Sequence, residues 1–134
     1  MKKIKVLLSL VLCLVLLSAC GGGDVRNVRR IPGESQLYSN GEINSAMKEV
    51  VDFFQKEFDG CTMTEIRYEE EKYAKRQRLE SEDYGREVII LLTDFDVDSS
   101  GGDGSLNPNS TYRNYQWTLT RTLFGWKLRD WGYG

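Results

Sequence analysis

The stretch that decides the fold is residues 39–60, SNGEINSAMKEVVDFFQKEFDG. Ser39 and Glu42 have the spacing of a capping box, in which the two side chains accept hydrogen bonds from each other's backbone N–H groups. Gly60 suits the left-handed conformation that ends many helices. Between these signals, apolar residues recur at helical spacing and predict one amphipathic helix. The residues of this apolar face are Ile43, Ala46, Met47, Val50, Val51, Phe54 and Phe58.

The next segment, residues 61–69, has the composition of a strand. Period-two alternation predicts that one face carries Thr62, Thr64, Ile66 and Tyr68. A dense charged segment follows at residues 70–83, with little apolar content. Its pattern fits either a short exposed helix or a long hairpin connection, and in both cases we expect a solvated excursion from the domain.

Three further segments predict the rest of the sheet. The apolar run in residues 87–97 does not alternate, which indicates a strand buried on both faces. One of its faces is expected to meet the helix, and the other needs a cover from a loop or a partner chain. Residues 111–122 alternate between apolar and polar side chains, and residues 126–133 form the last strand. The sequence therefore predicts an α+β fold: one N-terminal amphipathic helix on a curved antiparallel sheet of three to four strands.

The N-terminal segment has the pattern of a lipoprotein leader. Three lysines precede an uncharged apolar run, residues 6–17, which is shorter than the roughly 20 residues of a membrane span. Residues 17–20, LSAC, match the lipobox of bacterial lipoproteins, in which the cysteine thiol receives a diacylglyceryl group. We therefore expect a signal peptide over residues 1–19, lipidation at Cys20 and anchoring at the extracytoplasmic face of the bacterial cell membrane.

The remainder of the chain divides into two parts. Residues 20–38 are rich in glycine and arginine and predict a flexible tether, and residues 39–134 predict a single small α+β domain. Loss of the three leader lysines changes the formal net charge from −2 to −5. Because the basic residues are interleaved with acidic ones, we expect no nucleic-acid partner.

The composition also limits the chemistry. The sequence contains no histidine, which excludes a histidine-activated serine or cysteine nucleophile and histidine-ligated zinc or haem. Cys61 begins a predicted strand, where a small apolar residue packs well, and we expect it to be structural. The sequence shows no catalytic signature.

The run DFDVDSSGGDGS, residues 94–105, combines alternate acids with glycines. Carboxylates gathered at a strand end are the ligands that Ca²⁺ prefers. Asn107 stands where an EF-hand loop read from Asp96 requires a bidentate glutamate, so the run is not an EF-hand. The same residues fit a strand end followed by tight turns. The calcium hypothesis assigns the metal ligands to Asp94, Asp96, Asp98 and Asp103.

Two resemblances follow from the C-terminal half. Residues 117–132, WTLTRTLFGWKLRDWG, resemble the closing hairpin of the cystatin-like, nuclear-transport-factor-2-like superfamily over about a third of the domain. This resemblance implies an α+β domain with a helix across a curved sheet. Residues 94–112, with the closing Trp-Gly-Tyr, resemble a group of small lipoproteins of Gram-positive bacteria that has no assigned activity. The second resemblance supports the location and implies no mechanism.

Three classes of function remain open, and one of them, a structural or immunity-type lipoprotein of the envelope, is not separated by sequence from the first class. The first is a non-catalytic binding or interaction module that contacts an envelope protein or a small ligand through aromatic side chains such as Tyr112, Tyr115, Trp131 and Tyr133. The second, implied by the superfamily resemblance, is a pocket enzyme of the isomerase or dehydratase type. By position, its base would be Asp94 or Asp130, with a pKa raised by an apolar pocket. A deep pocket with one buried, unpaired carboxylate would favour the enzyme.

Overall fold

The computed structural model describes residues 21–133. The predicted signal peptide and Cys20 lie outside the described residues. The elements, in chain order, are β1 (Arg29–Ile31), α2 (Asn40–Glu57), β2 (Cys61–Arg67), α3 (Glu70–Tyr84), β3 (Val88–Val97), β4 (Thr111–Arg121) and β5 (Trp126–Gly132). The α+β class is confirmed. The prediction of one helix and three to four antiparallel strands is corrected to two helices and a mixed sheet of five strands among the described residues.

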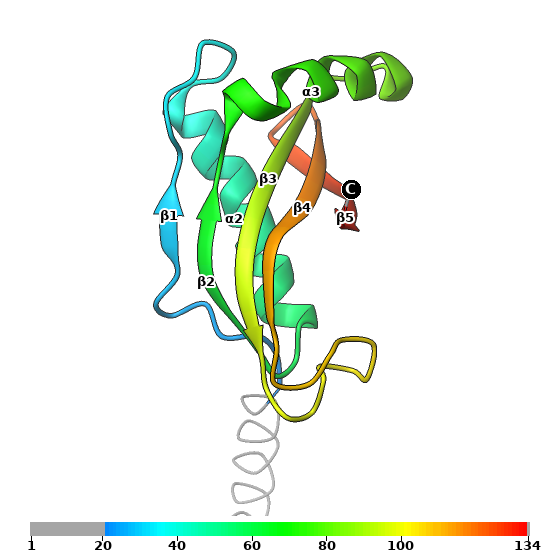
Figure 1. Ribbon diagram of the computed structural model, residues 1–134. Coiled ribbons are helices and arrows are strands. Elements are labelled where there is room, and N and C mark those ends of the chain that lie inside the picture. Colours follow the sequence, from blue (N-terminus) through cyan, green and yellow to red (C-terminus); the bar gives the residue numbers. More distant parts are fainter. Residues whose placement is uncertain (1–20, 134) are drawn as a thin grey trace, which may run out of the picture.

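The five strands lie in the order β1-β2-β3-β4-β5, and Figure 1 shows them as one twisted sheet. β1 runs parallel to β2, whereas the other neighbours are antiparallel. The parallel pairing begins with an isolated bridge between Asp24 and Thr62 and continues from Arg29 opposite Glu65. Part of the segment predicted as a tether, Arg29–Ile31, therefore forms an edge strand of the folded domain.

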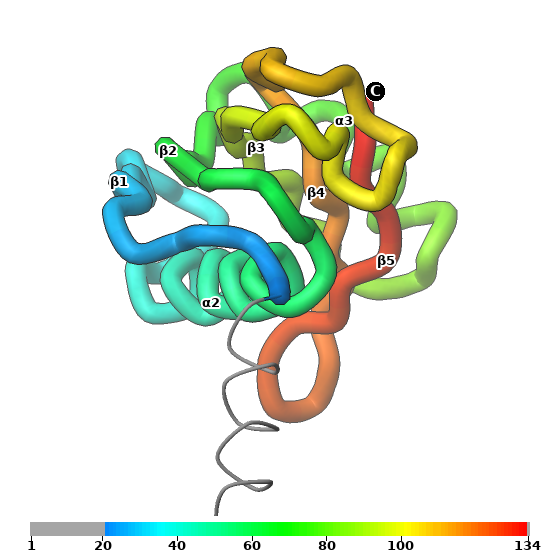
Figure 2. The backbone as a smooth tube through the Cα atoms, turned by 90° about the horizontal axis from the view of Figure 1, so that it is seen from below, coloured from blue at the N-terminus to red at the C-terminus, as the bar shows by residue number. Residues whose placement is uncertain are grey.

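The predicted amphipathic helix is confirmed as α2, which covers one face of the sheet (Figures 1 and 2). The Ser39 side chain accepts from the Glu42 N–H at 3.2 Å, and the Glu42 side chain accepts from the Ser39 N–H at 3.2 Å. These two bonds complete the capping box and fix the start of the helix. The hydrophobic core lies between α2 and the sheet, where Phe54, Phe95 and Trp117 are fully buried.

The strand β2 carries a β-bulge at Thr64. Met63 lies opposite Phe95 and Glu65 lies opposite Asp94, so one extra residue of β2 stands between them. The extra residue reverses the alternation, because a shift of one residue moves every later side chain to the other face. The prediction that Thr62, Thr64, Ile66 and Tyr68 share a face is therefore wrong. The buried side chains of this strand and the residue after it are Cys61, Met63, Ile66 and Tyr68.

The charged segment forms α3, which crosses the end of the sheet where β3 begins (Figure 1). β2 ends at Arg67, opposite Leu92, so the first residues of β3 have no strand beside them on that edge. Side chains complete their hydrogen bonds instead: the Ile90 N–H donates to Gln77 Oε1 at 2.8 Å, and the Val88 carbonyl accepts from the Tyr38 hydroxyl at 2.7 Å. The two-faced burial predicted for this strand is confirmed, and α3 of the same chain packs beside it.

None of the helices within residues 21–133 combines the length and the hydropathy of a membrane span.

Candidate functional site

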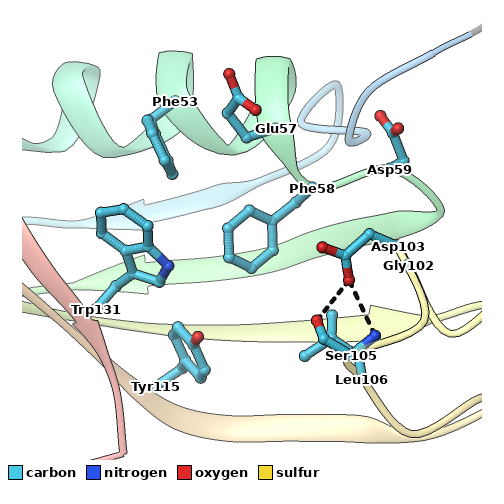
Figure 3. Close-up of a pocket in the computed structure, with 10 residues that line it drawn as sticks. All are labelled: Phe53, Glu57, Phe58, Asp59, Gly102, Asp103, Ser105, Leu106, Tyr115 and Trp131. Carbon is cyan, nitrogen blue, oxygen red and sulfur yellow. Dashed lines mark hydrogen bonds between the residues drawn. The ribbon is translucent and has the colours of Figure 1, made fainter.

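One cavity of the described domain lies beside the C-terminal end of α2 and has a volume of about 180 Å³ (Figure 3). Four aromatic rings line it from separate parts of the fold. Phe53 comes from α2, Phe58 caps that helix, and Tyr115 and Trp131 come from β4 and β5. The glycine-rich loop after β3 closes one side with Asp103 and Leu106. We treat this aromatic pocket as the candidate site.

Packing in the core fixes three of these rings. Phe58 stacks on Phe54 at 4.8 Å between ring centroids, and Tyr115 meets Phe95 edge-to-face at 5.1 Å. Burial raises the pKa of the Tyr115 hydroxyl, which therefore stays neutral at physiological pH. Phe53 touches Trp117 edge-to-face at 6.2 Å. Because these rings are held from behind, the walls of the pocket are formed before any ligand enters.

Trp131 is the exposed wall of the pocket. It pairs with Trp117 across β4 and β5, and the two rings stack with centroids 6.2 Å apart. Its other neighbour is Phe53, at 4.7 Å. Even with both contacts, 42% of Trp131 remains exposed to solvent. An exposed indole supported by buried rings can contact a ligand without a change in the core.

Three carboxylates stand on the rim: Glu57, Asp59 and Asp103. Asp59 accepts from the Gly22 N–H, so the first described residues of the chain help to position this side of the pocket. Asp103 accepts hydrogen bonds from the Ser105 hydroxyl and from the Ser105 N–H at 2.9 Å. These bonds lower the pKa of Asp103, which is therefore ionised at neutral pH.

The four predicted calcium ligands are held by separate partners. Asp94 accepts from Arg67 at 3.1 Å and Asp96 from the Thr111 hydroxyl at 2.6 Å. Asp98 accepts from the N–H and the hydroxyl of Ser100, and these bonds lower its pKa. Within residues 21–133, no three acidic or cysteine side chains converge in a group that could hold a metal ion.

The calcium hypothesis stays a prediction and has a direct test. A cation that binds the folded chain raises its melting temperature, because binding stabilises the native state alone. A rise in millimolar Ca²⁺ that disappears in Asp96→Asn would make this loop a metal site. An unchanged melting temperature would assign it to turn chemistry.

The two carboxylates considered as catalytic bases lie apart from the aromatic pocket. Asp94 is paired with Arg67 and also accepts from the Asn114 N–H at 2.9 Å. Asp130 lies at an exposed position on β5, opposite Thr118. The enzyme hypothesis called for an unpaired carboxylate in a deep pocket, and neither residue has that environment.

The aromatic residues predicted to make contacts divide into two groups. Tyr115 and Trp131 line the pocket, as described above, whereas Tyr112 stacks between Phe95 at 5.1 Å and Tyr133 at 5.9 Å. The sequence did not identify Phe53 or Phe58 as pocket residues: Phe58 belongs to the apolar stripe, which predicts a core position, and Phe53 lies outside that stripe. The available signal was the position of Phe58 at the helix end, next to Asp59 and Gly60.

The chain matches no protein-family model, and comparison with curated proteins and with solved structures found no match.

Proposed function

We propose that the protein is a lipoprotein anchored through Cys20 to the extracytoplasmic face of the bacterial membrane, and that its domain is a non-catalytic binding module. The lipobox at residues 17–20 carries the first part of this proposal. The preformed aromatic pocket, with one exposed indole, carries the second. The resemblance to small lipoproteins of Gram-positive bacteria agrees with the first part.

The start of the described domain adds a geometric argument. The Gly23 N–H donates to the Gln55 carbonyl at 2.9 Å, and the Asp24 N–H donates to the Cys61 carbonyl at 2.8 Å. Two residues, Gly21 and Gly22, separate a lipid on Cys20 from the first of these bonds. An extended chain spans about 3.3–3.6 Å per residue, so the domain would lie within about 10 Å of its anchor. The aromatic pocket, whose rim residue Asp59 binds Gly22, would then lie near the membrane surface.

Binding explains the pocket better than catalysis does. Its three carboxylates stand at exposed positions on the rim, whereas a carboxyl base needs an apolar environment to raise its pKa. The volume of about 180 Å³ lies below the roughly 300–1,000 Å³ of sites for drug-sized molecules. A small ligand, or one group of a larger one, is the occupant that this volume fits.

Lipid anchoring is tested by labelling and fractionation of bacteria that express the full chain. We expect the wild-type chain to incorporate labelled palmitate and to enter the membrane fraction, and Cys20→Ser to lose both properties. Cys61→Ser is the matched control, because it also removes a thiol and is expected to stay anchored. Membrane association that persists in Cys20→Ser would contradict the proposal.

Binding in the pocket is tested with a panel of small neutral, anionic, cationic and aromatic probes, observed by NMR on the full chain in a non-ionic detergent. We expect one class of probe to bind the wild type and to lose binding in Trp131→Leu. Tyr84→Leu is the control, since this ring on α3 is 43% exposed, nearly as much as Trp131, and lies outside the pocket. A panel in which no probe distinguishes the two variants would contradict the binding module.

A further inference from the structure

The rings of the aromatic pocket present several π-faces and edges to one small volume (Figure 3). Phe53 lies 4.7 Å from Trp131 and 6.4 Å from Phe58, and Phe58 lies 6.2 Å from Tyr115. The interplanar angles of these pairs are 52°, 63° and 81°, so the rings do not stack into a closed layer. Rings set at such angles around a cavity form the kind of cage that binds quaternary ammonium groups through cation–π attraction.

The charges around the pocket point in the same direction. Glu57, Asp59 and Asp103 line the rim, and the ten described lining residues include no lysine or arginine. The faces of aromatic rings are also negative, because their quadrupole places electron density above and below the ring plane. Carboxylates and π-faces therefore combine to attract a cation and to repel an anion.

The rings are also free of competing cations. In the described part of the chain, the guanidinium groups that lie over aromatic rings are those of Arg121, over Tyr38 and Trp126, and Arg129, over Tyr84. These interactions involve no ring of the pocket. The Trp131 indole is thus an unused cation–π partner with 42% of its surface in solvent.

The wall chemistry distinguishes between types of ammonium group. A primary ammonium is strongly hydrated and has three N–H donors that need acceptors. The Phe and Trp walls offer no such acceptors, the Tyr115 hydroxyl offers one, and the carboxylates stand on the rim. A methylated ammonium loses little hydration on entering and places its methyl groups against the rings.

We propose that the aromatic pocket binds a methylated ammonium group, such as the trimethylammonium head of choline, in the cavity lined by the rings of Phe53, Trp131 and Phe58. This inference rests on the proposed binding module and specifies its ligand class. The carboxylates of Glu57 and Asp103 supply charge complementarity without direct contact to the nitrogen. The proximity of the pocket to the lipid anchor would place it where a head group of the cell envelope is accessible.

The test uses the full chain in a non-ionic detergent and three probes. Choline is the ligand probe, the neutral alcohol in which carbon replaces the choline nitrogen is the matched control for shape, and ethanolamine is the control for methylation. Saturation transfer to the probe methyl or methylene protons reports contact, and titration provides the dissociation constant. We expect choline to bind about tenfold more tightly than either control. The neutral alcohol lacks the charge that the rings and the rim attract, and the primary ammonium of ethanolamine loses more hydration on entering.

Variants identify the site of binding. Trp131→Leu is expected to weaken choline binding about tenfold, while Tyr84→Leu leaves it unchanged. Glu57→Gln is expected to weaken it about twofold to threefold at low salt. Glu49→Gln is its control, an exposed acid on the same helix outside the pocket. Both pairs change exposed side chains, so the fold is retained.

Each result has one meaning. Equal binding of choline and its neutral isostere would overturn the ammonium assignment and leave the pocket as an apolar site, so the binding module would stand. Tighter binding of ethanolamine would overturn the methylated ligand class. Choline binding that persists in Trp131→Leu, or no binding of any probe, would overturn the inference. The wider probe panel and the palmitate labelling then test the proposed function separately.

Discussion

Arg67 donates to the Asp94 carboxylate at 3.1 Å. Asp94 is the residue of β3 opposite which both neighbouring strands, β2 and β4, carry a bulge. On one side, the Thr64 hydroxyl donates to the Asp94 carbonyl at 3.1 Å. On the other side, the Asn114 N–H donates to the Asp94 carboxylate at 2.9 Å, and Asn114 has the left-handed φ of 56°. One acidic residue thus satisfies polar groups of both irregular strands.

This relationship predicts a strong coupling between Arg67 and Asp94. Both side chains are largely buried, at 12% and 17% exposure, and Arg67 also contacts Glu65 and Glu69. We expect Arg67→Met to lower the free energy of unfolding by about 1–3 kcal/mol, because three carboxylates would then face one another. A double-mutant cycle with Asp94→Asn, measured by urea unfolding, should show a coupling of about 0.5–3 kcal/mol.

The exposed pair of Arg26 and Asp24 is the control for this cycle. Arg26 is 84% exposed, and surface ion pairs contribute at most about 1 kcal/mol. Arg26→Met should therefore change the free energy of unfolding by less than about 0.5 kcal/mol. Equal effects of Arg26→Met and Arg67→Met would show that the bulges do not depend on the buried guanidinium.

A second prediction concerns Gln77, which is 2% exposed on the otherwise solvated helix α3. Its Oε1 accepts from the Ile90 N–H at 2.8 Å, and its Nε2 donates to the Tyr68 hydroxyl at 3.1 Å. Gln77→Leu would leave a buried N–H unpaired, at a cost of about 1–3 kcal/mol in the free energy of unfolding. Urea unfolding measures the loss. Gln55→Leu, at an exposed position of α2, should be neutral, and a neutral Gln77→Leu would contradict the assigned role.

The sequence predicted the elements whose signals are local. The capping box of Ser39 and Glu42 and the apolar stripe behind it lie within one helix, and their spacing alone fixes α2. The unbroken apolar run of β3 is likewise local, and the full burial of the consecutive residues Ile89 and Ile90 confirms the predicted two-faced strand. These features depend on neighbours along the chain, which a sequence pattern records.

The features that the sequence missed depend on distant partners. β1 has three residues, and its pairing with Glu65 and Arg67 is set by the edge that β2 leaves open. The bulge at Thr64 follows from a contact with Asp94, 30 residues away. The aromatic pocket combines rings from α2, β4 and β5, which no pattern local to one element brings together.

A third prediction concerns the pH dependence of Cys61. Burial, together with the nearby carboxylates of Asp98 and Asp103, raises the pKa of its thiol from 9.0 to about 11. The unfolded chain therefore loses this proton first, and the stabilising contribution of Cys61 is present below pH 9.0 and disappears as the pH rises to about 11. Urea unfolding across this pH range should show that the free energy of unfolding declines as the pH rises, and that it declines less in Cys61→Ala.

Thiol reactivity provides the direct measurement of the same pKa. We expect iodoacetamide to label Cys61 in the native chain slowly at pH 9.0 and rapidly only near pH 11, as followed by mass spectrometry of the peptide that contains it. The chain unfolded in urea is the control, and its rate of labelling should depend on pH as expected for a thiol with the ordinary pKa of 9.0. Identical profiles in both states would contradict the raised pKa.

The last prediction uses two glycines with nearly the same backbone conformation. Gly22 has φ of 101° and Gly104 has φ of 96°, so alanine is strained at both positions, by about 1–3 kcal/mol. They differ in surroundings, because a Cβ at Gly22 would lie 2.1 Å from the Gln55 carbonyl oxygen, whereas a Cβ at Gly104 would have no neighbour within 4 Å. Only Gly22→Ala should detach the N-terminal segment from α2.

Hydrogen exchange separates these two effects. The Gly23 N–H bonds to Gln55, and the Met63 N–H bonds to the Asp24 carbonyl at 2.9 Å, so detachment in Gly22→Ala should remove protection at both amides. In Gly104→Ala, which shares the strain without the clash, both amides should remain protected. Loss of protection would also lengthen the spacer after Cys20 and move Asp59 and the pocket rim away from the anchor. Retained protection in Gly22→Ala would contradict the short attachment on which the proposed position of the pocket near the membrane depends.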